Sequence, residues 1–272
     1  MAEPAALSEV DTSTAGLAVS LRGVTKVYDG GVMALGPLDL DVRKGEFVSL
    51  LGPSGCGKST ALRLIAGLNA PTSGSVGISK PAGQARPGHS IGFVFQEPTL
   101  MPWTTVAGNV RLPLDLQRIE VTAAPRVMAA LARVGLTDFA DVYPRELSGG
   151  MKMRVSIARA LVTESMLLLM DEPFAALDEI TRFKLNDDLL SLWQSLRKTV
   201  VFVTHSVFES VYLSSRIVVM TPRPGRVFTE LRIDAPYPRD QRFRTSAEYG
   251  VLCRQASEAL AAAGEAKPAA RP

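Results

Sequence analysis

The sequence lacks the long hydrophobic run that a membrane-spanning helix requires. No apolar stretch approaches the roughly 20 consecutive residues that are needed to cross a bilayer. The first ten residues contain Glu3 and Glu9 and have neither a basic start nor an apolar core, unlike a secretory signal. We therefore expect neither an integral membrane span nor a secretory leader.

Cysteine is scarce and charge is nearly balanced. The two cysteines, Cys56 and Cys253, lie far apart in the sequence, which argues against a disulfide framework and for a reducing compartment. A formal net charge of +3 at pH 7 is too small to indicate a nucleic-acid partner. The 272 residues suffice for one large domain or two intimate lobes, and no internal repeat is visible.

The most informative segment that is present is 52–60, with the sequence GPSGCGKST. It fits G-x-x-x-x-G-K-[ST], in which glycines let the backbone curl so that N–H groups converge on a phosphate. Lys58 can reach the β- and γ-phosphates, and the Ser59 hydroxyl can bind Mg²⁺. An apolar run precedes the segment and a helical pattern follows it, so the sequence predicts a strand–loop–helix that binds a nucleoside triphosphate.

Two further apolar runs of strand type end in polar residues. One is followed by Asp171 and Glu172, and the other by His205. Ligands of open parallel sheets bind beyond the C-terminal ends of the strands, so we expect these residues and the loop 52–60 to meet at one edge. Asp171 would then hold Mg²⁺, Glu172 would accept a proton from an attacking water, and His205 would contact the γ-phosphate.

A second phosphate-binding pattern follows at 147–151, with the sequence LSGGM. Ser148 and two glycines open a long helical run, whose free amides and dipole suit an anion. One nucleotide does not need two such elements in one chain. The second is therefore predicted to serve a nucleotide that another subunit holds.

Together these motifs resemble the ATP-binding subunit of an ABC transporter over roughly residues 19–230. GPSGCGKST is similar to the Walker A motif of that family, LSGGM to its signature motif, LLLMDEP to Walker B and AALD to the D-loop. The resemblance identifies Gln96 as the Q-loop glutamine, His205 as the switch histidine and Tyr28 as the aromatic residue that stacks on adenine.

The resemblance implies an α/β fold, with a P-loop NTPase (RecA-like) core, an antiparallel β subdomain and an inserted α-helical subdomain at about 97–150. Residues 1–18 are expected to be a disordered N-terminal segment and 19–230 the ATP-binding cassette. Residues 231–272 are expected to form a C-terminal tail without a regulatory domain.

The residues that we expect in the site have three roles, some of them shared. They are Lys58, Gln96, Glu172 and His205 for catalysis; Tyr28, Gly52, Pro53, Ser54, Gly55, Cys56, Gly57, Lys58, Ser59, Thr60, Ser148, Gly149, Gly150 and Asp178 for binding ATP; and Ser59, Gln96 and Asp171 for Mg²⁺.

The resemblance also implies partners. It implies a head-to-tail homodimer with two composite ATP sites, docked through the helical subdomain on permease subunits at the cytoplasmic face of the bacterial inner membrane. The segments QEPTLMPWTTVAGNV and DEPFAALDEITR resemble importers of nitrate, sulfonates and taurine, which implies an indirect link to a periplasmic or extracytoplasmic solute-binding protein. The alternative is a soluble or exporter-type ABC ATPase that is not coupled to such a protein.

Three features leave alternatives open. Trp103 is either a core residue of the helical subdomain or a contact to a transmembrane partner. Met153 stands where family members carry glutamine, which leaves a polar contact at that position in doubt. Six arginines between 223 and 244 are expected to form a solvated surface rather than a contact to lipid headgroups.

Overall fold

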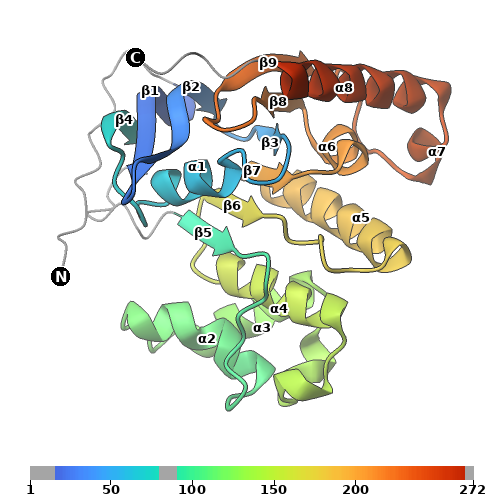
Figure 1. The fold of residues 1–272 in the computed structure, drawn as a ribbon. Coiled ribbons are helices and arrows are strands. Elements are labelled where there is room, and N and C mark those ends of the chain that lie inside the picture. The colour runs from blue at the N-terminus through green and yellow to red at the C-terminus, as the bar shows by residue number, and fades with distance from the viewer. Residues whose placement is uncertain (1–15, 80–90, 267–272) are drawn as a thin grey trace. The chain divides into compact units, whose positions relative to one another are not determined.

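The structure, a computed structural model, describes residues 16–79 and 91–266. The chain divides after residue 88 and after Lys198 into two compact units (Figure 1). Unit one combines the N-terminal part of the chain with everything from Thr199 onward, and unit two is the stretch between them. Most of the segment predicted to be disordered lies outside the described residues.

Unit one begins with an antiparallel sheet, as the resemblance to ABC cassettes implies. Strand β1 (Leu17–Tyr28) pairs with β2 (Val32–Arg43) on one side and with β4 (Ser73–Ile78) on the other. Gly30 has a φ of 91°, which the tight turn between β1 and β2 requires. Because β1 starts at Leu17, the ordered chain begins inside the segment 1–18 that was expected to be disordered.

The second sheet of unit one carries its strands in the order β7-β3-β8-β9. Strand β3 is parallel to both β7 and β8, and its five residues are all buried. Strands buried on both faces read as continuous apolar runs, which is why the sequence pattern predicted them. The bounds are β3 Phe47–Leu51, β7 Thr199–Thr204, β8 Arg216–Met220 and β9 Val227–Arg232, with helix α1 at Lys58–Ile65 and α6 at Val207–Leu213.

The C-terminal part of unit one is an ordered element, not the tail expected from 231 onward. It contains α7 (Gln241–Arg244) and the 19-residue helix α8 (Ala247–Glu265), which packs on α6 and β8 (Figure 1). Tyr249, Cys253 and Ala256 recur at helical spacing and are buried.

One of the six arginines, Arg239, anchors this C-terminal element. Its guanidinium is 4% exposed and donates to the carbonyl oxygens of Val211, Tyr212 and Ser214, each at 2.9 Å. The expectation of a uniformly solvated basic surface is therefore wrong at this position, because backbone carbonyls left open near the end of α6 can satisfy a buried guanidinium.

Unit two combines a parallel strand pair with helices. Strand β5 (Ile91–Val94) pairs with β6 (Leu167–Asp171). The helices are α2 Val106–Leu116, α3 Ala123–Arg133, α4 Gly149–Leu161 and α5 Glu179–Leu196, with short 3₁₀ turns at Thr137–Phe139 and Pro144–Glu146. An apolar cluster joins α2, α3 and α4, so the helical region continues past 150 into α4. Met153 is buried in α4.

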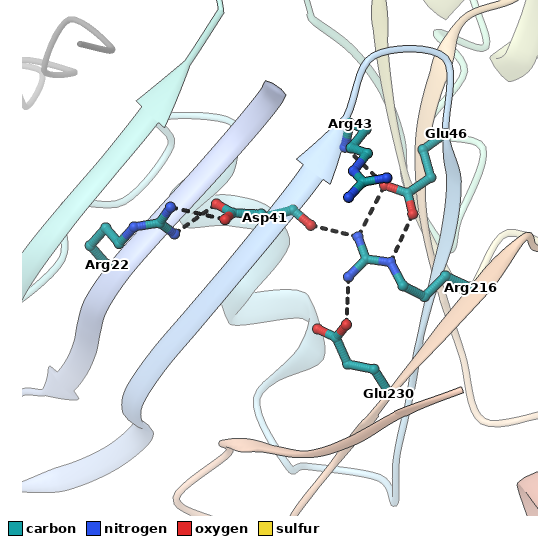
Figure 2. A network of polar contacts seen from close by, with 6 residues as sticks. All are labelled: Arg22, Asp41, Arg43, Glu46, Arg216 and Glu230. Carbon is teal, nitrogen blue, oxygen red and sulfur yellow. Dashed lines mark hydrogen bonds and ion pairs between the residues drawn. The ribbon is translucent and has the colours of Figure 1, made fainter. Parts of the chain in front are cut away.

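A network of ion pairs lies where β3 and β8 of unit one begin (Figure 2). Arg216 donates from Nε and Nη2 to the two carboxylate oxygens of Glu46 at 2.7 and 3.0 Å, and from Nη1 to Glu230 at 2.8 Å. Arg22 makes a similar two-pronged bond to Asp41, at 2.6 and 2.9 Å. These residues line a cleft of about 830 Å³.

Candidate functional site

The loop 52–60 joins the end of β3 to the start of α1, as predicted. Gly55 and Gly57 have φ values of 75° and 109°, a region that residues with a Cβ rarely adopt. Close packing adds a second constraint, because a Cβ at Gly57 would lie 2.7 Å from the carbonyl oxygen of Ala34. A Cβ at Gly52 would lie 2.9 Å from the Cys56 sulfur. These glycines are therefore required by the shape of the loop.

Lys58 bonds to the loop itself. Its ammonium donates to the carbonyl oxygens of Gly52 at 2.7 Å and Pro53 at 3.0 Å, and the side chain is 4% exposed. Helix α1 has no acidic residue in its first turn and no side-chain cap at Gly57. The positive end of its dipole is therefore available to an anion, beside Ser59 and Thr60.

Tyr28 lies next to this loop. Its hydroxyl is 3.4 Å from the Thr60 hydroxyl and accepts a hydrogen bond from the Asn69 amide at 3.3 Å. The ammonium of Lys26 lies 5.3 Å from the centre of the ring, which is 38% exposed. The structure thus brings together the predicted adenine-stacking residue and the phosphate loop.

His205 emerges at the same strand edge as loop 52–60. Leu51, the last residue of β3, is in register with Thr204, the last residue of β7, so the loop and His205 follow paired positions. Thr204 donates from its hydroxyl to Glu209 at 2.5 Å and accepts from the Ser206 amide at 3.0 Å. These bonds hold the backbone on both sides of the exposed His205.

In unit two, Gln96, Asp171 and Glu172 lie at one edge of the β5–β6 pair. Val94 is in register with Met170; Asp171 and Glu172 follow Met170 directly, and Gln96 lies two positions after Val94. Asp171 is 7% exposed, and Glu172 has a φ of 45°, in the left-handed region. A backbone strained in this way often marks a functional position.

Unit two also brings the signature segment close to the D-loop residue. Ser148 caps α4 by accepting a hydrogen bond from the Met151 amide at 3.3 Å, and Asp178 caps α5 by accepting one from Thr181 at 3.0 Å. The backbone hydrogen bond from Thr181 lowers the pKa of Asp178 below its ordinary value. A Cβ at Gly150 would lie 2.8 Å from the Thr181 side chain, so the starts of the two helices pack closely.

The segment after Gln96 is held by two residues that the sequence did not single out. Arg159 donates to the carbonyl oxygens of Pro98 at 2.7 Å and Thr99 at 2.9 Å. The Asn109 side chain accepts from the Met101 amide at 2.7 Å and returns a bond to the Met101 carbonyl at 3.1 Å. A buried polar residue inside an apolar helical pattern was the available signal for Asn109.

Trp103 lies on this held segment and is 76% exposed. The alternative that Trp103 is a core residue of the helical subdomain is therefore wrong. A third residue whose role the sequence did not indicate is Arg223, one of the six arginines that were expected to form a solvated surface. It donates to the carbonyl oxygen of Gly55 in the phosphate loop.

The predicted Mg²⁺ donors fit that ion chemically. Ser59, Gln96 and Asp171 offer hydroxyl, amide and carboxylate oxygens, the hard donors that Mg²⁺ takes together with waters and substrate phosphates. Across 16–79 and 91–266, no group of three or more His, Cys, Asp or Glu residues is placed to hold a metal. Nor does any helix in those ranges have the length and apolar character to cross a membrane.

Comparisons with known proteins agree with these observations. A family model described as ABC transporter matches residues 35–175. An uncharacterized ABC transporter ATP-binding protein of Methanocaldococcus jannaschii is 47% identical over 235 residues, 85% of this chain and 86% of the relative. The aliphatic sulfonates import ATP-binding protein SsuB of Bacillus cereus is 41% identical over 228 residues, 83% of this chain and 90% of the relative.

A solved structure gives the same result. A dimeric, post-hydrolysis ATP-binding cassette bound to ADP and Pi matches with a TM-score of 0.69 and 36% sequence identity. The match covers 80% of this chain and 100% of that one.

Proposed function

Because the chain belongs to the ABC transporter family, as an ATPase with the cassette fold that binds ATP with Mg²⁺, we propose that it is the motor subunit of an importer for a small solute. The observation that carries the importer proposal is the similarity to the aliphatic sulfonates import protein over most of both chains. The solute class that this favours is a small solute such as a sulfonate, taurine or nitrate.

The residues of the site divide the work of ATP hydrolysis. Lys58 exchanges its carbonyl acceptors for phosphate oxygens, while the amides of loop 52–60 and the start of α1 bind the same phosphates. Tyr28 stacks on adenine, Glu172 accepts the proton of the attacking water, and His205 contacts the γ-phosphate. Ser59, Gln96 and Asp171 would hold Mg²⁺, and the bound ion would supply positive charge that offsets the negative charge of the phosphates.

The active form is a homodimer in this proposal. Ser148, Gly149 and Gly150 at the start of α4 form a second anion-binding helix terminus, and Asp178 lies close to it. Each would face the nucleotide that the other subunit holds, which gives two composite sites. The dimeric arrangement of the similar cassette with ADP and Pi supports this assignment.

The coupling surface would lie on unit two. Trp103 is 76% exposed on a segment that Arg159 and Asn109 hold in place directly after Gln96. A large exposed aromatic side chain on a fixed backbone is a strong candidate for an interface anchor. The partner would be a permease, and the subunit would be peripheral on the cytoplasmic face of the membrane. A solute-binding protein would act through that permease, and no nucleic acid is involved.

The variant Trp103→Ala tests this proposal, with Val251→Ala on α8 of unit one as its control. We expect an unchanged melting temperature for the purified subunit, because Trp103 is already exposed. Co-purification with a co-expressed importer permease that binds the wild-type subunit should fall about 10-fold or more, the size expected for an interface anchor. Permease binding that survives Trp103→Ala would show that Trp103 is not the anchor. A wild-type subunit that binds no importer permease, or complexes whose ATPase ignores a solute-loaded binding protein, would contradict the importer proposal and favour a soluble or exporter-type ATPase.

A further inference from the structure

A loop distant in sequence supports the phosphate-binding loop from outside. Residues 221–226 connect β8 to β9, and Arg223 on this loop donates from Nε and Nη2 to the carbonyl oxygen of Gly55, at 3.2 and 3.1 Å. Arg223 and Gly55 are 168 positions apart in the sequence. The contact lies wholly inside unit one.

The loop that carries Arg223 is fixed by its own hydrogen bonds. The Thr221 hydroxyl donates to the Pro224 carbonyl at 3.1 Å and accepts from the Arg226 amide at 3.1 Å. The Thr221 amide donates to the Arg226 carbonyl at 3.0 Å. Arg223 therefore starts from a defined backbone, which lowers the entropy lost when its long side chain is held in one position.

Gly225 anchors the same loop against two neighbours. Its amide donates to the Ala34 carbonyl, and its carbonyl accepts from the Gly36 amide, both at 3.0 Å. A Cβ at Gly225 would lie 2.1 Å from the carbonyl oxygen of Cys56, a backbone atom that cannot move aside alone. The close approach of the 221–226 loop to the phosphate loop therefore depends on glycine.

The direction of the Arg223 bond has a physical consequence. In an anion-binding nest the N–H groups face inward, so carbonyl groups face outward and need donors of their own. A hydrogen bond to the Gly55 carbonyl polarises the peptide group that it shares with the Cys56 amide, which makes that amide a stronger donor to its acceptor, the Pro53 carbonyl, at 3.3 Å. The Arg223 bond thus strengthens a hydrogen bond that holds the turn of the phosphate loop. The guanidinium also places a positive charge near the bound phosphates.

We propose that Arg223 is a positioning residue of the phosphate-binding loop, which sets the affinity for nucleoside di- and triphosphates by holding the Gly55 carbonyl. It acts from behind the loop and does not touch the reacting atoms. The proposal rests on the assignment of the nucleotide to loop 52–60.

This role predicts an effect on binding rather than on chemistry. The loop holds the phosphates in the ground state and in the transition state alike, so weakening it removes uniform binding and raises KM with little change in kcat. In Arg223→Ala we expect the Kd for MgADP and the KM for MgATP to rise about 5- to 10-fold, the size of one ordinary hydrogen bond, with kcat within about 2-fold.

The experiment titrates the purified full chain with fluorescent mant-ADP and measures ATPase rates and the nucleotide-free melting temperature. Arg223→Lys keeps the charge without the two-pronged geometry, and Arg223→Gln keeps a donor without the charge. Both should give affinities between wild type and Arg223→Ala. The matched control is Arg232→Ala, which removes an exposed arginine at the far end of β9 and should leave the Kd unchanged.

A Kd within 2-fold of wild type in Arg223→Ala would overturn the proposal, as would an equal loss of affinity in Arg232→Ala. If Arg223→Ala instead lowers the melting temperature, and Arg223→Lys restores it without restoring any affinity, Arg223 is merely structural. Gly225→Ala disturbs the same support through the backbone and should also raise the Kd about 5-fold or more. Lys58→Ala distinguishes a failure of the Arg223 proposal from a failure of the nucleotide assignment. If Lys58→Ala loses nucleotide binding while the Arg223 variants retain it, loop 52–60 still binds ATP and only the role of Arg223 is wrong.

Discussion

Arginines lie at both ends of the β7-β3-β8 strands in unit one, and their guanidinium groups bond to different kinds of acceptor at the two ends. Where β3 and β8 begin, Arg216 bonds to the carboxylates of Glu46 and Glu230 (Figure 2). Where β3 ends, Arg223 bonds to a neutral carbonyl, and the first turn of α1 carries no acidic residue. A carboxylate balances the charge of the guanidinium that it faces with a negative charge of its own, whereas a carbonyl group accepts the hydrogen bond without supplying a negative charge.

This difference distinguishes two edges of the strands: a structural edge around Arg216, where β3 and β8 begin, and a working edge at loop 52–60, where β3 ends. The network around Arg216 lines a cleft of about 830 Å³, yet nearly every charge drawn there already has an opposite charge beside it. The edge at loop 52–60 combines a helix N-terminus that has no acidic residue in its first turn with Lys58, whose ammonium bonds to carbonyl groups of the loop, and this arrangement suits an incoming phosphate. The chemistry of these groups, not the size of the cleft, points to the substrate.

The largest effect is expected from Glu172→Gln, at the end of the β5–β6 pair in unit two. The amide keeps the shape of the site but cannot accept a proton, so hydrolysis should be about 10²- to 10⁴-fold slower, the usual contribution of a general base. MgATP binding should be retained, and an ATP-bound dimer should accumulate, which light scattering can detect. Wild-type turnover in this variant would show that Glu172 is not the base.

Arg216→Met tests the opposite edge. It leaves the carboxylate of Glu46, whose side chain is 15% exposed, without its main partner. The free energy of unfolding in urea should fall by about 2–4 kcal/mol, near the value for breaking a buried ion pair. The folded variant should keep its nucleotide affinity, and the exposed control Arg242→Met should change neither quantity. A variant of normal stability with weakened nucleotide binding would reverse the assignment of the two edges.

Much of the working edge could be predicted because each part has a local signal. The apolar run of β3 followed by a glycine-rich segment fixes where a phosphate loop lies, and the run of β7 fixes where His205 emerges. The observed register between Leu51 and Thr204 then brings the two together. Strands that are buried on both faces carry their signal in a few consecutive residues, so no distant contact is needed to find them.

The parts that could not be predicted depend on distant contacts or weak patterns. Helix α8 is rich in alanine, which forms helices well but gives a faint amphipathic pattern, so its sequence resembles a tail. The roles of Arg223 and Arg239 depend on carbonyl groups far away in the sequence, and composition cannot distinguish them from solvated arginines. The exposure of Trp103 follows from packing, because a large apolar residue type fits a core or an interface equally well.

The smallest effect is expected from Asp41→Asn, which removes the ion pair with Arg22 but keeps the Asp41 backbone carbonyl. The hydrogen bond from Arg22 lowers the pKa of Asp41 in the folded state. Stability from this pair is therefore present above the unfolded pKa of about 3.9 and is lost as pH falls through the lower folded value. Both side chains are near half exposed, so the variant should lose only about 0.2–1 kcal/mol at pH 7.

Urea unfolding at pH 7 and in acid checks the sign of this effect. The difference between wild type and Asp41→Asn should shrink as pH falls below about 4 and disappear once Asp41 is protonated. A difference that grows in acid would contradict the depressed pKa.

The account depends most on the claim that loop 52–60 is where nucleotide binds, and a thermal melt with MgADP tests it directly. At about 100 times the Kd, ligand binding adds about 2.7 kcal/mol, which is roughly 5–10 °C for a chain of this size. Wild type and Arg216→Met should both gain this shift, and Lys58→Ala should lose nearly all of it. A Lys58→Ala protein that keeps the full shift would show that the phosphates bind elsewhere.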